Sequence, residues 1–346
     1  EIEVSKNHNM QLAKKILLNS GYGAVSNEYF RWFDLKLSEA ITVSGQYAIR
    51  FIERAINRKL NEIMNTTNID YVIAADTDSV YLSLDSYVKT LGDLTTEEIV
   101  DKLDEFSRDV MEPYISEQYQ IMADQMNAYE QKMIMKREAI ADKGIWTAKK
   151  KYVLNVYDNE GVRFAEPEQK ITGIEAVRSS TPTVCREAIK ECIKIIMNDT
   201  EEDALQFIDK TRDMFNSKDF EDISFPRSVN NIGEYSHPNL IYKKGCPIAV
   251  RGALLYNNTV DKNNLGDVLP KIKEGDKIRF SYLKMPNPIH ENVIAVPSEL
   301  PKELDLEDYI DYNTQFEKGF MRPIRNILEA INWRTDNSAS LEDFFG

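Results

Sequence analysis

The sequence predicts an α+β fold in which short antiparallel hairpins pack with long helices. Two hairpin signals support this prediction, one at residues 71–84 and one at residues 152–165. The third observation is a long helical pattern at residues 39–64, where apolar side chains recur at helical spacing. With 346 residues, the chain is long enough for two domains that each bury a core.

The remaining elements follow from capping and turn residues along the chain. The expected helices are residues 1–24, 39–64 capped by Ser38, one from Thr95 to about Gln125, one opened by Thr181-Pro182, one opened by Thr200, and much of 305–332. The expected strands are residues 71–75, 80–84, 152–157, 162–165, 248–250 and 277–282.

The most informative motif is Asp76-Thr77-Asp78-Ser79, which lies between the two apolar runs of the first hairpin. The run before it indicates a buried strand, and the alternating run after it indicates a second strand. Side chains two apart in an extended segment leave on the same side, so both carboxylates are expected to point one way. Mg²⁺ prefers such oxygen ligands beside substrate phosphates. A solvated turn is the alternative, because Asp and Ser are common turn residues.

A second candidate site lies on the first helix. Lys15, Asn19 and Tyr22 are spaced four and then three residues apart, which places them on one helical face. A cation, an amide and a phenol on one stripe suit a ligand with a phosphate at one end and a flat base at the other. Residues 16–18 are apolar and are expected to pack on the opposite face. An ordinary amphipathic helix with a polar outer stripe is the alternative.

Together these motifs resemble the family B DNA polymerases. The segment Lys15–Gly23 is similar to motif B of that family, and the acidic tetrad is similar to motif C. Trp146–Tyr152 resembles a further family element, with Lys151 where arginine is common. The tail Ser340–Gly346 resembles the sliding-clamp peptide of replicative polymerases from T-even-like bacteriophages. The ordered match covers nearly the whole chain.

The resemblance implies a domain plan and a reaction. The domains would be the end of a fingers helix (1–25), a palm with a mixed or antiparallel sheet (26–172), a mostly helical thumb (173–334) and a clamp-binding tail (335–346). The enzyme would be a DNA-directed DNA polymerase, a nucleotidyltransferase that adds deoxynucleotides to a primer 3′-hydroxyl with two Mg²⁺ ions. The rival interpretation is a non-catalytic module that binds primer-template DNA and the sliding clamp.

The resemblance also assigns roles to residues. They are Asp78 and Asp76 as metal ligands, Glu138 as a further catalytic acid, Lys15, Asn19 and Tyr22 for the incoming dNTP, Lys149, Lys150, Lys151, Tyr152 and Arg251 for DNA, and Leu341, Phe344 and Phe345 for the clamp. If residues 149–152 form a strand, the first and third face one way and the others face the opposite way. The alternatives are a solvated lysine run, a surface salt bridge for the arginine, and a tail folded back on the thumb.

Three departures from the family pattern bear on mechanism. Gly21 stands where leucine is usual, Ala75 stands where glycine is usual, and no Asp-x-x-Ser-Leu-Tyr-Pro segment (motif A) or set of exonuclease acids occurs in the chain. One carboxylate pair cannot hold two divalent ions in catalytic geometry. The chain is therefore expected to be inert alone and to need an N-terminal half that carries motif A and the exonuclease. Its first residue, Glu1, favours a piece of a longer chain over a natural split subunit.

Composition limits the other possibilities. The net charge of −14 argues against indiscriminate nucleic-acid binding, so any DNA contact must use locally gathered cations. No apolar run approaches the ~20 residues that cross a bilayer, and no signal-peptide pattern is present, so no membrane partner and a cytoplasmic location, in the host cell if phage-encoded, are expected. The three cysteines fit a reducing compartment, and Cys185 and Cys192 are predicted core residues.

Overall fold

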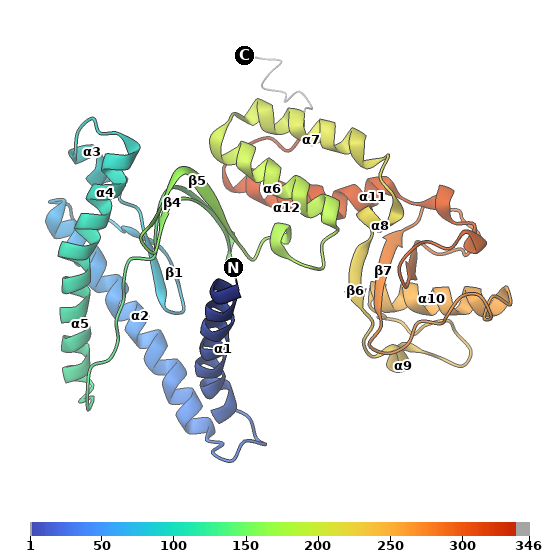
Figure 1. Ribbon diagram of the computed structural model, residues 1–346, viewed down its shortest axis with the longest axis horizontal. Helices are drawn as coiled ribbons and strands as arrows, with labels where there is room; N and C mark the ends of the chain where they lie inside the picture. Colours follow the sequence, from blue (N-terminus) through green and yellow to red (C-terminus); the bar gives the residue numbers. More distant parts are fainter. Residues whose placement is uncertain (1, 337–346) are drawn as a thin grey trace. The chain divides into compact units, whose positions relative to one another are not determined.

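The computed structural model describes residues 2–336, and these residues form the α+β architecture that the sequence predicts (Figure 1). The chain divides into two compact units, Glu1–Ile140 with Asp158–Arg163, and Ala141–Tyr157 with Phe164–Gly346. The domain boundaries predicted at residues 25, 172 and 334 stay predictions. Among the described helices, none combines the length and the apolar character that crossing a bilayer requires.

The first unit consists of helices around one small hairpin. Its elements are α1 (Ile2–Val25), α2 (Leu35–Ile63), β1 (Val72–Asp76), β2 (Ser79–Leu82), α3 (Asp85–Thr90), α4 (Thr96–Phe106), a π-helical turn (Ser107–Met111) and α5 (Glu112–Gln125). The apolar stripe predicted on α2 forms the centre of the core, since Ile52, Ile56 and Leu60 are fully buried.

Capping residues fix where these helices begin. As predicted, a helix opens at Thr95. A capping box of Thr95 and Glu98 forms this end of α4, and its hydrogen bonds hold the pKa of the Glu98 carboxyl below its usual value. The predicted cap of α2 is wrong. Asp34 takes that position and accepts the Leu37 N–H at 3.0 Å, so the helix begins four residues earlier than predicted and Ser38 is buried inside it.

The second unit contains the remaining helices and two three-stranded sheets, except for the ends of β3, β4 and β5, which fall in the first unit. Its elements are β3 (Ala139–Ala148), β4 (Lys151–Asn159), β5 (Val162–Thr172), α6 (Thr183–Asn198), α7 (Glu201–Phe215), α8 (Phe220–Ile223), β6 (Phe225–Ser228), α9 (Ile232–Tyr235), α10 (Ile248–Lys262), β7 (Lys277–Tyr282), β8 (Val293–Val296), α11 (Tyr312–Phe316), a π-helical turn (Glu317–Met321) and α12 (Arg322–Ala330). The strand orders are β3-β4-β5 and β6-β7-β8, and the second sheet is antiparallel.

Several predictions for this unit are confirmed. The hairpin of residues 152–165 exists with longer strands than predicted, and Thr200 forms a capping box with Asp203. Cys185 and Cys192 are core residues on α6, where burial raises the pKa of both thiols to about 12. Both thiols are therefore protonated and unreactive at neutral pH.

Two predictions for this unit are wrong. Residues 248–250 open α10 and are not a strand, because Ala249, Ala253 and Tyr256 continue a buried helical stripe that a three-residue window does not reveal. The start of α6 is also shifted. Pro182 takes the cap position one residue before the helix, where Thr181 was predicted, and no side chain caps this end.

Candidate functional site

The acidic tetrad forms the tip of the β1–β2 hairpin, as predicted. The strands are antiparallel, Asp76 pairs with Ser79, and Thr77 and Asp78 make the turn. Thr77 adopts φ 57°, in the left-handed region, and the Asp78 N–H donates to the Asp76 carbonyl at 2.6 Å. The Thr77 hydroxyl donates to Asp76 Oδ1 at 3.0 Å, so the turn also orients this carboxylate.

The reason given for both carboxylates leaving on one side does not hold, because it assumed that residues 76–78 are extended. The left-handed Thr77 breaks that geometry. The predicted buried strand is also wrong in part, since Val72 is buried while Ile73 is 53% exposed. Val72 packs in the core cluster with residues of α2 and α5, and Ile73 does not belong to that cluster.

Asp78 is exposed and Asp76 is half-buried at this tip. The pKa of Tyr119, a buried residue of α5, is raised first by burial and then by the negative charge of Asp78, which places this carboxylate within electrostatic reach of α5. Two carboxylates at a tight turn are suitable oxygen donors for a hard divalent cation. Across residues 2–336, however, no three His, Cys, Asp or Glu side chains gather into a metal-binding group, so the structure does not assemble Glu138 with this pair.

On α1, Lys15 and Asn19 are exposed, and Tyr22 is about half exposed. The Tyr22 hydroxyl lies 2.7 Å from Thr42 Oγ1 on α2, and hydrogen bonds from Thr42 and then Ser38 lower the pKa of this phenol. This bond attaches the C-terminal end of α1 to α2.

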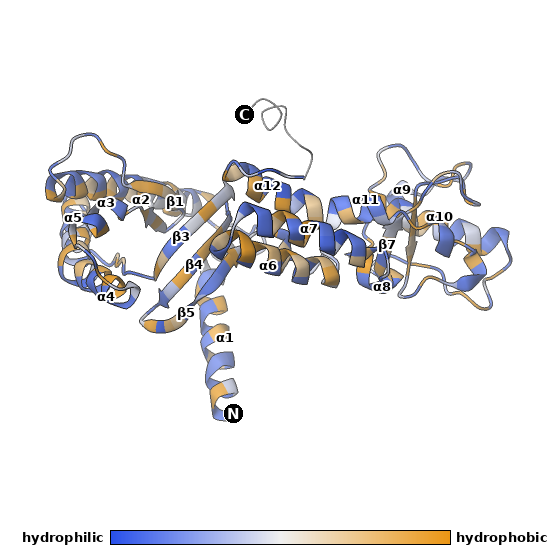
Figure 2. Cartoon of the chain, turned by 90° about the horizontal axis from the view of Figure 1, so that it is seen from above, coloured by the Kyte–Doolittle hydropathy of each residue, from blue (hydrophilic) through white to orange (hydrophobic). Residues whose placement is uncertain are grey.

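The packing predicted for residues 16–18 of α1 is wrong within the described chain. Ile16, Leu17 and Leu18 are 57%, 74% and 79% exposed. Figure 2 shows hydrophobic residues (orange) along this helix. Most of α1 has no described element packed over it, so its apolar side chains are not covered.

The lysine run occupies a turn rather than a strand, which corrects the predicted alternation. β3 ends at Ala148, Lys149 and Lys150 form the turn with Lys150 at φ 61°, and β4 begins at Lys151. A Cβ added to Gly173 would lie 1.9 Å from the Lys150 carbonyl oxygen, so this glycine allows the turn to pack directly on its backbone. The turn therefore presents two exposed lysines from a fixed backbone.

The other predicted DNA-binding residues have contacts inside the second unit. Lys151 Nζ pairs with Glu175 Oε1 at 2.9 Å, and the Tyr152 ring lies 6.1 Å from that of Trp146. Arg251 donates to Asn292 Oδ1 at 2.6 Å and lies over the Tyr242 ring. These contacts fix the positions of the three side chains and leave part of each surface accessible. The clamp residues Leu341, Phe344 and Phe345 lie outside the described residues.

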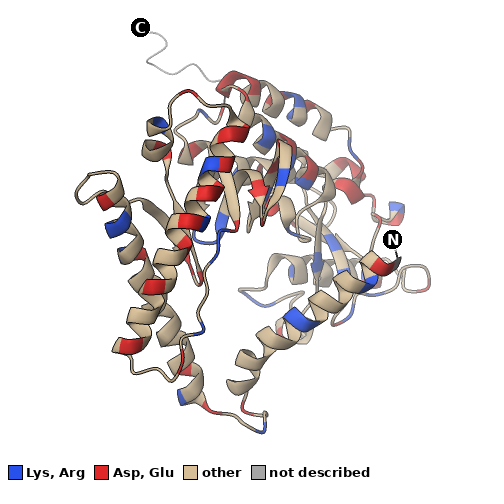
Figure 3. Ribbon diagram, turned by 60° about the vertical axis from the view of Figure 1, so that its left-hand side comes forward, with Lys and Arg blue, Asp and Glu red and all other residues tan. Residues whose placement is uncertain are grey.

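A buried ion network that the sequence prediction missed lies beside Glu138. Arg137 donates to Asp158 and, at 2.5 Å, to Asp104, and its side chain is 14% exposed while Asp158 is fully buried. Arg163 Nε lies 2.8 Å from the other oxygen of Asp158 in an ion-pair contact. In Figure 3 the ribbon is coloured red at acidic and blue at basic residues, and both kinds occur along the helices.

The network also bears on the position of Glu138. Its carbonyl accepts the Glu160 N–H at 2.6 Å, and Arg137 uses its own N–H to bond Glu112 Oε1 at 3.0 Å. The Asp158–Arg163 turn is thereby tied to this segment. The sequence signal was weak, because an Asp at the start of an Asp-Asn-Glu-Gly turn indicates a solvated position.

Comparisons with known proteins show which family the chain belongs to. Residues 3–331 match the model for DNA polymerase family B. The DNA-directed DNA polymerase of Enterobacteria phage T4 is 38% identical over 351 aligned residues, which cover 97% of this chain and 38% of that protein. The DNA-directed DNA polymerase of Escherichia phage RB69 gives the same identity and coverage. The chain thus spans 38% of the length of these relatives. It belongs to DNA polymerase family B and is of the T4-like type.

Proposed function

We propose that this chain supplies the palm and thumb of a template-directed DNA polymerase whose remaining metal ligand comes from a segment outside the sequence. The observation that carries this proposal is the hairpin tip, where Asp76 and Asp78 stand two residues apart on a tight turn. Family membership supports template-directed synthesis as its purpose. The chain, in the cytoplasm of a phage host, would act with an N-terminal part that carries motif A.

The donor set fits part of a Mg²⁺ site. Bound divalent ions in such a site supply charge that stabilises the attacking primer hydroxyl and the leaving pyrophosphate. Asp78 is the exposed ligand, and Asp76 is held by the Thr77 hydroxyl and is the second, weaker candidate. Because a pair of acids lacks the third carboxylate of a complete group, the proposal requires a further acid from outside the chain.

The remaining residues of the chain bind and orient the substrates in this proposal. Lys15 contacts the triphosphate, Asn19 lines its pocket, and Tyr22 lies against the nascent base pair. The bond from Tyr22 to Thr42 gives that phenol a fixed position on α2. The role of Glu138 as a further acid rests on the resemblance alone.

The test is primer extension with separated parts. The chain alone is expected to incorporate no nucleotide, and a mixture with a polypeptide that carries the missing N-terminal part is expected to extend a primer in a template-dependent way. Extension by the chain alone would contradict the proposal. If every mixture binds primer-template tightly without incorporation, the non-catalytic module is the better interpretation.

The lysine turn gives a prediction about duplex binding. Replacing Lys149 and Lys150 together by Ala should weaken duplex binding on the order of tenfold at physiological salt. It should also reduce the slope of log affinity against log salt concentration by about two, because two phosphate contacts are lost. The matched control is the replacement of Lys190 and Lys194 together by Ala. Both are exposed lysines of α6, and their replacement removes the same amount of charge. Titrations of labelled duplex at several salt concentrations measure both. Equal losses in the two double variants would indicate a general charge effect instead of contact at the turn.

The tail gives a prediction about processivity. Deleting Leu341–Gly346 should shorten the products made with the sliding clamp and leave synthesis without the clamp unchanged, because a short aromatic anchor of this kind suits a hydrophobic groove. Product lengths on a long template, with and without clamp, are the measurement. Equal loss in both reactions would instead assign the tail a structural role.

A further inference from the structure

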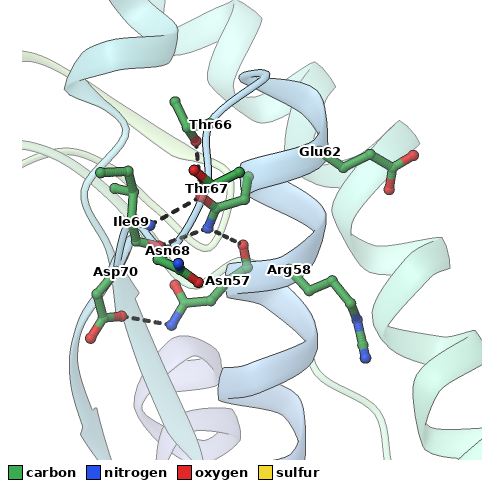
Figure 4. Close-up of a pocket in the computed structure, with 9 residues that line it drawn as sticks. Asn57, Arg58, Glu62, Thr66, Thr67, Asn68, Ile69 and Asp70 are labelled. Atoms are coloured by element: carbon green, nitrogen blue, oxygen red, sulfur yellow. Dashed lines mark hydrogen bonds between the residues drawn. The ribbon is translucent and has the colours of Figure 1, made fainter.

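Two asparagines of α2 hold the segment that leads into β1. Asn57 and Asn61 are four residues apart, one helical turn, on the side of α2 that faces residues 66–72. They line a polar hollow of about 620 Å³ (Figure 4). Asparagine is unfavourable inside a helix because its side chain competes for backbone hydrogen bonds. The presence of two asparagines on α2 therefore indicates that their side chains have other polar partners.

Asn57 bonds directly to the first residues of the strand. Its Oδ1 accepts the N–H of Tyr71 at 2.8 Å and that of Val72 at 3.0 Å, and its Nδ2 donates to Asp70 Oδ1 at 2.6 Å. Figure 4 shows the bond between Asn57 and Asp70. Tyr71 and Val72 are buried, so their N–H groups need a protein acceptor.

Asn61 holds the loop one turn further along. Its Nδ2 donates to the carbonyls of Ile69 and Asn57 at 2.7 and 2.8 Å, and its Oδ1 accepts the Ile69 N–H and the Thr66 hydroxyl, both at 3.0 Å. The side-chain amides of Asn57 and Asn61 therefore find their partners within the protein. This pattern indicates a built joint between helix and strand and not a binding site.

The joint bears on the acids because its hydrogen bonds, together with the packing of Tyr71 and Val72 in the core, fix where β1 begins. A two-stranded sheet is marginally stable by itself, and the pairing of β1 already shifts between Val72 and Ala74. A slip of one residue would move the tip by about 3.4 Å and reverse the face of each side chain. Asp76 lies four residues beyond Val72, about 13 Å along the strand.

We propose that Asn57, supported by Asn61, is a positioning residue that sets the register of β1 and so places Asp76 and Asp78 in the polymerase site. This inference rests on the proposed function. Asn57 does not touch substrate or metal, and it acts through the backbone of Tyr71 and Val72. A displacement of about 1 Å in a catalytic group can cost about 10²-fold in rate.

The experiment compares Asn57→Ala with Ile56→Val in the assembled polymerase. Ile56 is fully buried on the same helix, so its variant removes a buried methylene and keeps the side-chain hydrogen bonds of the joint. Asn57→Ala should lower kcat by about 10²-fold with little change in the KM for dNTP, whereas Ile56→Val should stay within about twofold. Comparable losses in both variants, or an unchanged kcat in Asn57→Ala, would overturn the inference.

A second readout does not depend on activity. Amide hydrogen exchange at Tyr71 and Val72 should become faster in Asn57→Ala and stay unchanged in Ile56→Val. Unchanged exchange at both amides in Asn57→Ala would overturn the inference even if activity fell. If Asp78→Asn is fully active in the same assay, the proposed function fails, while the exchange result still reports on the joint.

A double variant tests which side chain donates in the hydrogen bond between Asn57 and Asp70. Asn57→Asp alone places a second carboxylate against that of Asp70, and this variant should incorporate nucleotide slowly. Adding Asp70→Asn returns a donor to the opposite side, so N57D/D70N should recover most of the lost rate. A double variant no faster than Asn57→Ala would contradict the assigned pairing.

Discussion

Replacing Asp78 by Asn in the assembled polymerase is expected to lower nucleotide incorporation by at least about 10²-fold, with primer-template affinity within about twofold of the original. Asparagine keeps the size of the side chain and removes its charge. Because Asp78 is exposed at the hairpin tip, the change should leave the fold intact. The loss should appear in kcat, since the charge is needed where negative charge develops in the transition state. Single-turnover incorporation measures it.

The matched control is Asp93→Asn, the same chemical change at another exposed acid of the first unit. This variant should incorporate nucleotide within about twofold of the unaltered enzyme. Normal incorporation by Asp78→Asn would remove the metal-ligand role from that residue. Equal losses in both variants would mean that the overall charge of the unit, and not the hairpin tip, sets the rate.

Replacing Arg137 by Met is expected to destabilise the first unit by about 3 kcal/mol, because it leaves the buried carboxylate of Asp158 without one of its cations. Asp158 is fully buried, and of its two arginines Arg137 is the less exposed, at 14% against 37%. Arg163 remains in the variant, so the cost should lie at the lower end for a broken buried pair. The urea midpoint of the transition of this unit, at constant slope, measures the change.

Lys102→Met is the control for this substitution. It breaks the pair of Lys102 and Glu105 in the same unit, in which both side chains are about half exposed, and it should cost less than about a third of the stability lost in Arg137→Met. A loss from Arg137→Met no larger than this would show that the network contributes little. Arg137→Met should also loosen the segment that holds Glu138. Arg137 directly precedes Glu138, and the Glu160 N–H donates to the Glu138 carbonyl.

The local parts of the fold could be predicted from the sequence. The capping box at Thr200 and the acidic turn at Asp76–Ser79 depend on residues within a few positions of one another. Short-range patterns of this kind carry their own physical cause, which is a side chain bonded to a neighbouring backbone group. The helix predicted at residues 1–24 likewise corresponds to α1.

The errors arise where the cause lies elsewhere in the chain or outside it. The exposed Leu17 and Leu18 were expected to pack, but no described element covers them. The lysine run forms a turn that packs on Gly173, more than twenty residues away, where a Cβ would collide with the Lys150 carbonyl oxygen. The bonds of Asn57 to β1 and of Arg137 to Asp158 join residues 14 to 21 positions apart, which no periodicity indicates. An Asn inside an amphipathic helix was the one available signal.

The most direct measurement is a crystal structure of the assembled polymerase with primer-template, incoming dNTP and Mn²⁺, using the anomalous signal of manganese. The account predicts a manganese position at metal–ligand distance from the Asp78 carboxylate, about 2.0–2.1 Å as for Mg²⁺, with another ligand from the part of the polymerase outside this chain. Manganese bound by other residues, with Asp78 facing solvent, would contradict it.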